Sequence, residues 1–448
     1  MKKLGIYKFD LMNFYLSNKE KIGRKFVLLD SPKVNKLSEY SYILADFSEQ
    51  FQLKTTENYK KSKEILFKQL RNSLLNVPKE YKKNNFFSGG FFGIVSYDFN
   101  RFIEKIDDIS EDDLQLPQLI FLKPQLIIVK NELTGEMFEI NYGVEDYLWN
   151  LGNNIKSPTI DFKEIVWEDL EIFETNMNKE KFTEIVNKAK EYIKEGDIFQ
   201  VNLSQRFTGE IGDKDSLELY RILREINPSP FASYVALEDF KIISQSPERL
   251  VRLKDGVSDT RPIAGTRRLE KGNEEKNQKL AEEMLNDPKE CAEHVMLVDL
   301  ERNDIGKLAK FGTVKVDEFM VVERYSHVMH LVSNVSGELK ENYDSIDLLE
   351  SMFPGGTITG APKIRSMEII EELEPTRRGF YTGSLGYIDY SGNMDFNIII
   401  RSFIEKENKV HFQVGAGIVY DSIPEREYKE TINKGRAMIL AYHNFMKR

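Results

Sequence analysis

The sequence contains one cysteine, Cys291, in 448 residues. An intrachain disulfide framework is therefore excluded, and a single thiol is typical of proteins from a reducing compartment. No stretch approaches the roughly 20 apolar residues of a membrane-spanning helix. The first residues, MKKLGIYKFDLMNFYLSNKEK, also lack the apolar core of a secretory signal. We therefore expect a cytoplasmic protein that does not associate with a membrane.

The chain also lacks a basic block, an internal repeat and a low-complexity tract. Its 63 Lys and Arg residues are outnumbered by 73 Asp and Glu residues, and the formal net charge is −10. Nucleic acid and acidic membrane surfaces are therefore not expected partners. The composition, 41% hydrophobic and 30% charged, is that of a globular protein. The length suits two or three domains, or one large core with an appendage.

Many short segments rich in β-branched and aromatic residues predict strands, and fewer segments carry the period of a helix. We expect short strands across 1–56, a strand within the glycine-punctuated run 86–102, and further strands within 117–142 and 198–420. Helices are expected at 58–76, 179–194, 287–308, 362–373 and 424–446. Together these elements indicate an α+β fold with large antiparallel sheets.

One segment divides the chain into two regions. Residues 144–176 are acidic and weakly patterned, which is typical of a connection rather than of a core element. We therefore expect one region at 1–150 and a second at 177–448.

The helix expected from Asp287 to Leu308 carries the first candidate site. Asp287 followed by a proline is a typical helix start. Glu290 and Glu293 lie three apart within otherwise apolar sequence, so they project from one face of the helix. Carboxylates in such surroundings are costly unless they are paired. A divalent cation that prefers oxygen ligands, such as Mg²⁺, would pair them.

A second acidic pair, Glu427 and Glu430, has the same spacing in the last helix. A solvated helix face explains such a pair equally simply in a chain with 73 acidic residues. If the two helices face each other, the two pairs form a magnesium site with room for a substrate anion.

The segment IFQVNLSQRF (198–207) alternates as a strand does. One face holds Phe199, Val201, Leu203 and Phe207, and the other holds Gln200, Asn202, Ser204 and Arg206. The polar face is either an ordinary wet surface or the wall of a polar site.

Other candidate residues lie at strand ends and glycine turns. The glycine-containing turns GT (265–266), PGG (354–356) and GAG (415–417) allow backbone N–H groups to approach an anion, although plain turn geometry explains each alone. Arg401 ends the apolar segment FNIIIR, where a guanidinium needs a carboxylate or phosphate. His330 is either a core histidine or a site residue, and Glu248 is either a surface or a site residue.

Five separated blocks resemble one family. They are YIKEGDIFQVNLSQRF (192–207), RPIAGTRR (261–268), DPKECAEHVMLVDLERNDIGKLA (287–309), FPGGTITGAPKIRSMEIIEELEPTRRG (353–379) and GAGIVYDSIPEREYKET (415–431). The sequence resembles the chorismate-utilising enzymes over nearly its whole length. The resemblance implies antiparallel sheets packed as a sandwich with helices outside. It also implies an N-terminal region of the anthranilate-synthase type at 1–150 and a chorismate-binding catalytic region at 177–448.

The resemblance also implies roles for single residues. Glu293 and Glu430 would bind Mg²⁺ directly, with Glu290 and Glu427 behind them through water. Glu248 would protonate the departing C4 hydroxyl of chorismate, and His330 would lie beside the ring. The substrate carboxylates would be held by Gly265, Thr266, Tyr381, Arg401, Gly415, Ala416, Gly417 and Lys434.

Gln200 indicates the nucleophile. Family members that add water carry a lysine at the matching position as a general base. A glutamine there implies that ammonia attacks instead. Since the chain has no glutaminase-like region, the resemblance implies a separate glutamine amidotransferase subunit that supplies ammonia.

Two ammonia-using activities stay open. Ala264 stands where well-known aminodeoxychorismate synthases carry a nucleophilic lysine, and there the chain is similar to anthranilate synthases. The blocks QVNL (200–203), SPER (246–249), FPGG (353–356) and TGSLGY (382–387) are more similar to aminodeoxychorismate synthases, some of which lack the lysine. The resemblance therefore favours 4-amino-4-deoxychorismate, on the folate and 4-aminobenzoate pathway. The alternative products are anthranilate and pyruvate, on the tryptophan pathway.

Two further inferences concern regulation. The tryptophan pocket of anthranilate synthases typically uses LLES, RYS and a methionine after NPSPY. This chain has LLDS (28–31), EYS (39–41) and NPSPFA (227–232), so the resemblance does not imply tryptophan feedback. A non-enzymatic, amino-acid-binding regulator is the remaining alternative. It would be expected to lose the acidic residues first, and the four glutamates and Glu248 are all present.

Overall fold

The structure is a computed structural model that describes residues 1–32, 39–54, 58–143, 147–151, 158–162, 167–270, 272–324 and 328–448. The strands of its first half are β1 (Lys2–Ile6), β2 (Phe26–Asp30), β3 (Tyr40–Leu53), β4 (Gly90–Val95), β5 (Leu119–Asn131), β6 (Glu136–Asn141), β7 (Glu174–Thr175), β8 (Gln200–Glu210), β9 (Phe231–Ala236) and β10 (Lys241–Ser246). Those of its second half are β11 (Arg249–Lys254), β12 (Val257–Thr260), β13 (Ile263–Arg268), β14 (Lys315–Arg324), β15 (Val328–Glu338), β16 (Gly360–Ala361), β17 (Ser384–Asp389), β18 (Met394–Asn397), β19 (Ser402–Lys406) and β20 (Lys409–Ile418).

The helices are α1 (Leu11–Ile22), α2 (Tyr59–Leu75), α3 (Asn100–Ile103), α4 (Lys179–Glu195), α5 (Ser216–Ile226), α6 (Glu274–Asn286), α7 (Pro288–Leu308), α8 (Ser345–Met352), α9 (Lys363–Leu373) and α10 (Pro424–Met446). Single 3₁₀ turns occur at η1 (Tyr97–Phe99), η2 (Trp167–Leu170) and η3 (Gly356–Ile358).

Antiparallel pairing arranges the strands in two arms that share the long strand β5. The first arm runs β1–β6–β5–β3–β2–β9–β10–β19–β20–β8. The second runs β5–β4–β17–β18–β11–β12–β15, and β15 also pairs with β13 and β14. Residues 119–122 of β5 pair with β4, and residues 126–130 pair with β6. On its other edge, β5 pairs with β3 from residue 119 to residue 131, so its first half is shared by both arms and its later half belongs to the first.

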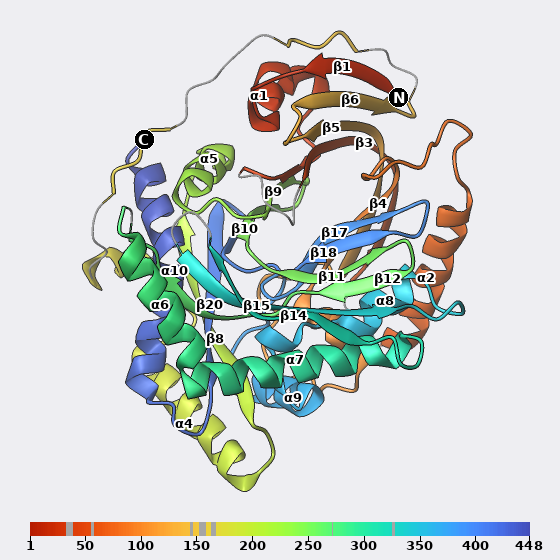
Figure 1. Cartoon of the computed structure of the whole chain (residues 1–448). Coiled ribbons are helices and arrows are strands. Elements are labelled where there is room, and N and C mark those ends of the chain that lie inside the picture. The colour runs from red at the N-terminus through yellow and green to blue at the C-terminus, as the bar shows by residue number, and fades with distance from the viewer. Residues whose placement is uncertain are drawn as a thin grey trace.

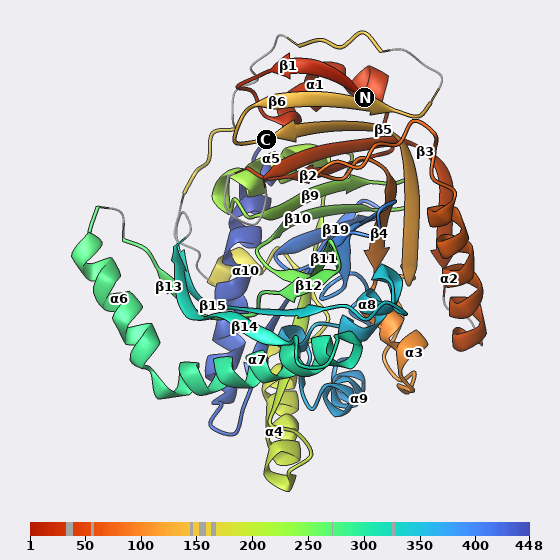
Figure 2. The same cartoon turned by 45° about the vertical axis from the view of Figure 1, so that its right-hand side comes forward.

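The core lies on both faces of the arms. One apolar cluster contains residues from β2, β3, β9 and β10 of the first arm together with β4 and β17 of the second. The outer faces pack against helices: α1, α5 and α10 cover the first arm, and α2, α8 and α9 contribute to the cluster beside the second. The helices accordingly lie around the sheets (Figure 1). Figure 2 shows α7 running below β14 and β15. The predicted α+β sandwich with outer helices is confirmed.

The five expected helices are present, and local sequence explains their ends. Asp287 caps α7 by accepting hydrogen bonds from the N–H groups of Lys289 and Glu290, with proline at the first helical position. Gly196 ends α4 in the left-handed conformation at φ 85°. These short-range signals require no tertiary contact, which is why sequence patterns located the helices.

Three expectations were wrong or incomplete. Residues 1–56 contain helix α1 as well as strands, because Asp10 caps it by accepting from the N–H of Asn13. The run 86–102 is a strand only at 90–95 and then turns into η1 and α3. Helices α5, α6 and α8 lie in sequence where only strands or loops were expected. Their apolar faces are short, and burial against the sheets completes them.

The predicted boundary near 144–176 stays a prediction, since residues 144–146, 152–157 and 163–166 lie outside the described residues. Strands from either side of it pair with each other, β2 with β9 and β4 with β17. The sheets therefore continue through both regions. Within the described residues, no helix is both long enough and apolar enough to cross a membrane.

Candidate active site

Three of the four residues on the polar face of β8 are buried, and Asn202 is half-buried. Gln200 and Arg206 are each 5% exposed, and Ser204 is fully buried. The interpretation of this face as a wet surface is therefore wrong. Phe199, expected on the apolar face, is 72% exposed and precedes the strand. Because buried polar groups need partners, the residues around β8 define the candidate site.

The glycines of β20 make room for the β8 side chains. Gly415 pairs with Ser204, and Gly417 pairs with Asn202. A Cβ atom on Gly415 would lie 2.4 Å from Asn202 Oδ1, and one on Gly417 would lie 2.5 Å from Gln200 Nε2. Any larger residue at either position would collide with these side chains. The segment at 415–417 is therefore a buried strand rather than the glycine turn considered from sequence.

Glu248 lies between β10 and β11 and is 6% exposed. Thr357 Oγ1 donates a hydrogen bond to Glu248 Oε1 at 2.8 Å, and the Ile263 N–H donates to the same carboxylate. Burial raises the pKa of Glu248 to about 7, although Thr357, Arg401 and Lys434 favour the charged form. A carboxyl group that keeps its proton near neutral pH is suited to general-acid chemistry.

His330, in β15, is 2% exposed. Its Nδ1 lies 3.2 Å from the carbonyl oxygen of Gly265, so Nδ1 carries the proton and donates to that carbonyl. Burial, and then the charge of Arg401, lowers the pKa of His330 to about 4. The imidazole is therefore neutral at physiological pH. Gly265 has φ 57°, and a Cβ there would lie 2.8 Å from Glu290 Oε2, so only glycine suits this position.

Arg401 links the candidate acid and the histidine, because its charge affects the pKa of both Glu248 and His330. It does not end a strand, as the sequence suggested. Residues 398–401 connect β18 and β19, and Arg401 has φ 53°. Its backbone carbonyl accepts from the N–H of Gln245 at 3.2 Å. This turn directs the chain from one sheet arm into the other.

Tyr381 and Lys434 approach the same strand from different elements. The Tyr381 Oη would lie 2.9 Å from a Cβ on Gly415, and Lys434 Nζ donates to the Gly415 carbonyl at 3.1 Å. The charge of Lys434 also affects Glu248. Ala416 is fully buried. The backbone of Thr266 pairs with His330, and its side chain lies outside what the structure describes.

The α7 carboxylates face β8 and β13. Glu293 Oε1 accepts from Gln200 Nε2 at 3.3 Å. Glu290 Oε1 lies 2.7 Å from Arg267 Nη1. The other oxygen, Glu290 Oε2, is buried and makes no hydrogen bond within the described residues. A buried carboxylate oxygen without a partner is costly, and its chemistry suits a cation.

The α10 carboxylates are more exposed. Glu427 is half-buried, and Glu430 is exposed with Lys434 Nζ 4.0 Å from its Oε1. In both views the first turns of α7 pass close to the first half of α10 (Figures 1 and 2). Among the residues that the structure describes, no three His, Cys, Asp or Glu side chains form a group that holds a metal ion.

Sequence reasoning missed three residues of this site. Thr357 holds the acid, and Arg267 pairs with Glu290. Glu301, on α7, is 4% exposed and accepts from the Gly356 N–H. Burial, followed by the charge of Asp304, raises the pKa of Glu301 to about 8. The available signal was periodicity, since Glu301 lies eleven residues after Glu290, about three helical turns, and thus on the same helix face.

A cavity of about 210 Å³ lies elsewhere, between the two sheet arms. Its lining includes residues of the segments 28–31, 39–41 and 227–232, the three segments compared above with a tryptophan pocket. Asp30 in this lining already accepts from Tyr220 Oη at 2.9 Å and from Arg224 Nε at 2.5 Å. One carboxylate oxygen, Oδ2, is therefore engaged by the protein itself, whereas Oδ1 is buried and makes no hydrogen bond within the described residues.

Comparison with known proteins identifies the class that this fold and site define. The model of the chorismate-binding enzyme family matches residues 24–440. The chain belongs to this family.

The relatives include proteins named anthranilate synthase and proteins named aminodeoxychorismate synthase. The chain is 41% identical to anthranilate synthase component 1 of Aquifex aeolicus, over 96% of this chain and 91% of that protein. It is 45% identical to aminodeoxychorismate synthase component 1 of Bacillus subtilis, over 79% of this chain and 76% of that protein. The crystal structure of anthranilate synthase component I from Streptococcus pneumoniae has a TM-score of 0.75 and 32% identity, covering 91% of this chain and 93% of that one. The family is thus established, and the reaction is that of a chorismate-utilising enzyme.

Proposed function

We propose that this protein aminates chorismate with ammonia in a magnesium-dependent reaction that forms 4-amino-4-deoxychorismate. The observation that carries the proposal is Glu248, a buried acid with a pKa of about 7. It lies beside the cationic groups of Arg401 and Lys434, which affect it electrostatically. A site that combines a proton donor with fixed positive charge suits a dicarboxylate that must lose a hydroxyl group.

The chemistry balances with these groups. The ammonia nitrogen forms a bond to ring carbon C4, as the 4-amino product requires, and the C4–oxygen bond breaks. Glu248 gives its proton to the departing hydroxyl, which leaves as water. The new ammonium substituent then loses one proton, which returns to the Glu248 carboxylate. The sum is chorismate plus ammonia giving the amine plus water.

Cationic and backbone groups bind the substrate in this proposal. Arg401 and Lys434 attract the carboxylates, and Tyr381 and the Gly415 backbone lie beside Lys434. His330 is neutral and lies against the ring without adding charge. Buried, preorganised dipoles and charges of this kind stabilise a developing anion better than water does.

Glu293 and Glu430 would hold Mg²⁺, with Glu290 and Glu427 behind them. The partnerless buried Oε2 of Glu290 supports this assignment, and carboxylate oxygens are the donors that Mg²⁺ prefers. When bound, the ion neutralises the glutamates and orients a substrate carboxylate.

Ammonia is the proposed nucleophile because Gln200 occupies the position at which water-adding members of the family carry a basic lysine. An amide cannot take a proton from water near neutral pH, whereas ammonia needs no such activation. Both relatives described above are named as component 1, which supports a glutamine amidotransferase as the second component that supplies ammonia.

Anthranilate is the second candidate product, and one observation favours it. Ala264 is buried in β13 opposite Leu331, and it provides no nucleophilic side chain. The lysine is also absent from some aminodeoxychorismate synthases, and the blocks around residues 200, 248 and 355 favour the 4-amino product.

The deciding experiment incubates the protein with chorismate, Mg²⁺ and ammonium at alkaline pH. We expect a product that a lyase converts to 4-aminobenzoate. Fluorescent anthranilate with pyruvate would establish the second candidate instead. No turnover with ammonia, or turnover without Mg²⁺, would contradict the proposal.

Glu248→Gln tests the acid directly. The variant keeps the shape and loses the proton, so kcat is expected to fall by roughly 10²–10⁴ with little change in chorismate affinity. Glu425→Gln, at an exposed position of α10, is the matched control and should keep full activity. An unchanged kcat in Glu248→Gln would refute the role.

A further inference from the structure

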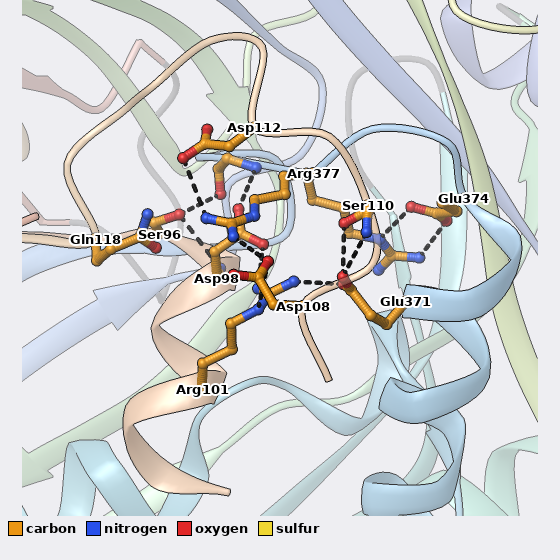
Figure 3. Close-up of polar contacts among 12 residues, drawn as sticks. Ser96, Asp98, Arg101, Asp108, Ser110, Asp112, Gln118, Glu371, Glu374 and Arg377 are labelled. Carbon is orange, nitrogen blue, oxygen red and sulfur yellow. Dashed lines mark hydrogen bonds and ion pairs between the residues drawn. The ribbon is translucent and has the colours of Figure 1, made fainter. Parts of the chain in front are cut away.

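Two adjacent arginines, Arg377 and Arg378, follow α9, and both are buried. They serve different parts of the molecule. Arg377 Nη1 donates to Asp112 Oδ2 at 3.1 Å, and Nη2 donates to Asp108. Figure 3 shows Arg377 among these two carboxylates of the loop that follows α3. Arg377 therefore fixes a loop that contains none of the candidate site residues.

Arg378 instead contacts segments that form the candidate site. Its Nη1 donates to the carbonyl oxygen of Ile358 at 2.9 Å, and its Nη2 donates to the carbonyl oxygen of Asn202 at 2.6 Å. Glu374 holds the guanidinium from one side, with Nε and Nη2 at 2.9 and 2.7 Å from its two oxygens. The Tyr97 ring lies 4.7 Å from the guanidinium carbon. One planar cation thus joins η3 to β8.

The contact with η3 connects Arg378 to Glu248 through Thr357. Ile358 directly follows Thr357, whose hydroxyl donates to Glu248. On the other side of Thr357, the Gly356 N–H donates to Glu301. The 3₁₀ turn is therefore held at both ends, by Arg378 at its last residue and by Glu301 at its first.

The contact with β8 connects Arg378 to the segment Gln200–Ser204, which forms a wall of the candidate site. Glu374 Oε1, besides holding Arg378, accepts from Ser204 N–H at 2.8 Å and from Ser204 Oγ at 2.7 Å. Ser204 pairs with Gly415 of β20. Asn202 N–H donates to the Thr359 carbonyl at 2.8 Å, which ties β8 to the residue after η3.

We propose that Arg378 is a positioning residue that fixes η3 against β8, so that Thr357 holds the acid Glu248 at a set distance from the Gln200–Ser204 wall. This inference rests on the proposed function for the role of Glu248, while the clamp itself is a property of the fold. Five guanidinium hydrogen bonds, to Glu374, the Ile358 and Asn202 carbonyls and Thr382, require the planar fork of arginine. A lysine keeps the charge and cannot reach all of these acceptors.

Arg378→Lys and the matched control Arg377→Lys test the clamp by hydrogen exchange. Both variants lose buried arginine contacts, so both should lower overall stability. In Arg378→Lys the amides of Gly356, Thr359 and Asn202 should exchange roughly tenfold or more faster than in wild type. In Arg377→Lys they should exchange as in wild type. Equal exchange at these amides in the two variants would overturn the proposal, whatever the activity.

Glu374→Gln is the second variant, in case Arg378→Lys does not fold. It keeps an acceptor for Ser204 and removes the charge that holds Arg378. The same three amides should exchange faster than in wild type, and unchanged exchange would again overturn the proposal.

A double-mutant cycle in kcat tests the connection to the acid. Thr357→Val should lower kcat in wild type by roughly tenfold and in Arg378→Lys by less than about twofold, because the clamp variant has already displaced Thr357. In Arg377→Lys, Thr357→Val should lower kcat by roughly tenfold, as in the wild type. Multiplicative effects of Thr357→Val and Arg378→Lys would refute the connection. Absence of chorismate turnover by wild type would refute the proposed function, and the exchange measurement would still decide the clamp.

Discussion

Glu248→Gln is expected to stabilise the protein at alkaline pH while it removes activity. The pKa of Glu248 is about 7 in the folded protein, against an ordinary value of 4.5, because the carboxyl is buried. Between pH 4.5 and about pH 7, the Glu248 carboxyl keeps its proton in the folded state and has lost it in the unfolded state. The free energy of unfolding of the wild type therefore falls as pH rises through this window.

The size of this loss in unfolding free energy follows from the difference of about 2.5 units between the two pKa values of Glu248. At about 1.36 kcal/mol per unit, the wild type loses roughly 3 kcal/mol between pH 4.5 and pH 8. Glutamine does not titrate, so Glu248→Gln avoids this loss. A chain of 448 residues has an unfolding entropy of roughly 0.9 kcal/mol/K, so the difference corresponds to about 3 °C in Tm.

The assay is thermal unfolding without substrate or Mg²⁺ at pH 5 and pH 8. The Tm of Glu248→Gln minus that of the wild type should increase by about 3 °C from the lower to the higher pH. The exposed control Glu425→Gln should show no such increase. A pH-independent difference, or a variant that is less stable than the wild type at pH 8, would refute the assignment of Glu248 as a buried, proton-holding acid.

The remaining predictions concern the metal and the nucleophile. Glu293→Gln and Glu430→Gln should abolish turnover, because each loses a charge and an oxygen donor for Mg²⁺; near-normal activity of Glu293→Gln at saturating Mg²⁺ contradicts this. Glu290→Gln and Glu427→Gln should mainly raise the Mg²⁺ concentration for half-maximal activity, and an unchanged requirement would speak against them. Without ammonia, the wild type should form no covalent complex with chorismate, whereas Ala264→Lys should trap a ring adduct visible by intact-protein mass spectrometry. An adduct mass in the wild type would mean that another residue is the nucleophile.

Much of the fold followed from short-range patterns. The helices at 179–195 and 288–308 were predictable because capping residues and apolar periodicity lie within the segments themselves. Helix α1 was missed, since strand-like aromatic residues surround a cap at Asp10 that only the hydrogen bond to Asn13 reveals. The break at 398–401 was also missed, because the apolar run FNIIIR continues without any turn signal.

Most candidate site residues were found by resemblance rather than by pattern. Spacing alone allowed a solvated face for Glu427 and Glu430, and a wet surface for the polar side of β8. Burial of Gln200 and Ser204 removes the second alternative. Thr357 and Arg378 had no local signal, since a threonine in a glycine-rich loop and an arginine after a helix are ordinary surface residues in sequence.

The sequence by itself determined the family, the class of fold and the location of the principal helices. Helix-capping residues, apolar periodicity and the five motif blocks each lie within a short segment of the chain. Only the tertiary structure decided the protonation states and the contacts of the site residues. The pKa of Glu248 depends on burial by strands distant in sequence. The neutral state of His330 depends on the Gly265 carbonyl and on burial. The different roles of Arg377 and Arg378 depend on the acceptors that the fold brings to each, the Asp112 carboxylate to Arg377 and the Ile358 and Asn202 carbonyls to Arg378. These are long-range electrostatic and packing effects, and neighbouring residues in the chain do not specify them.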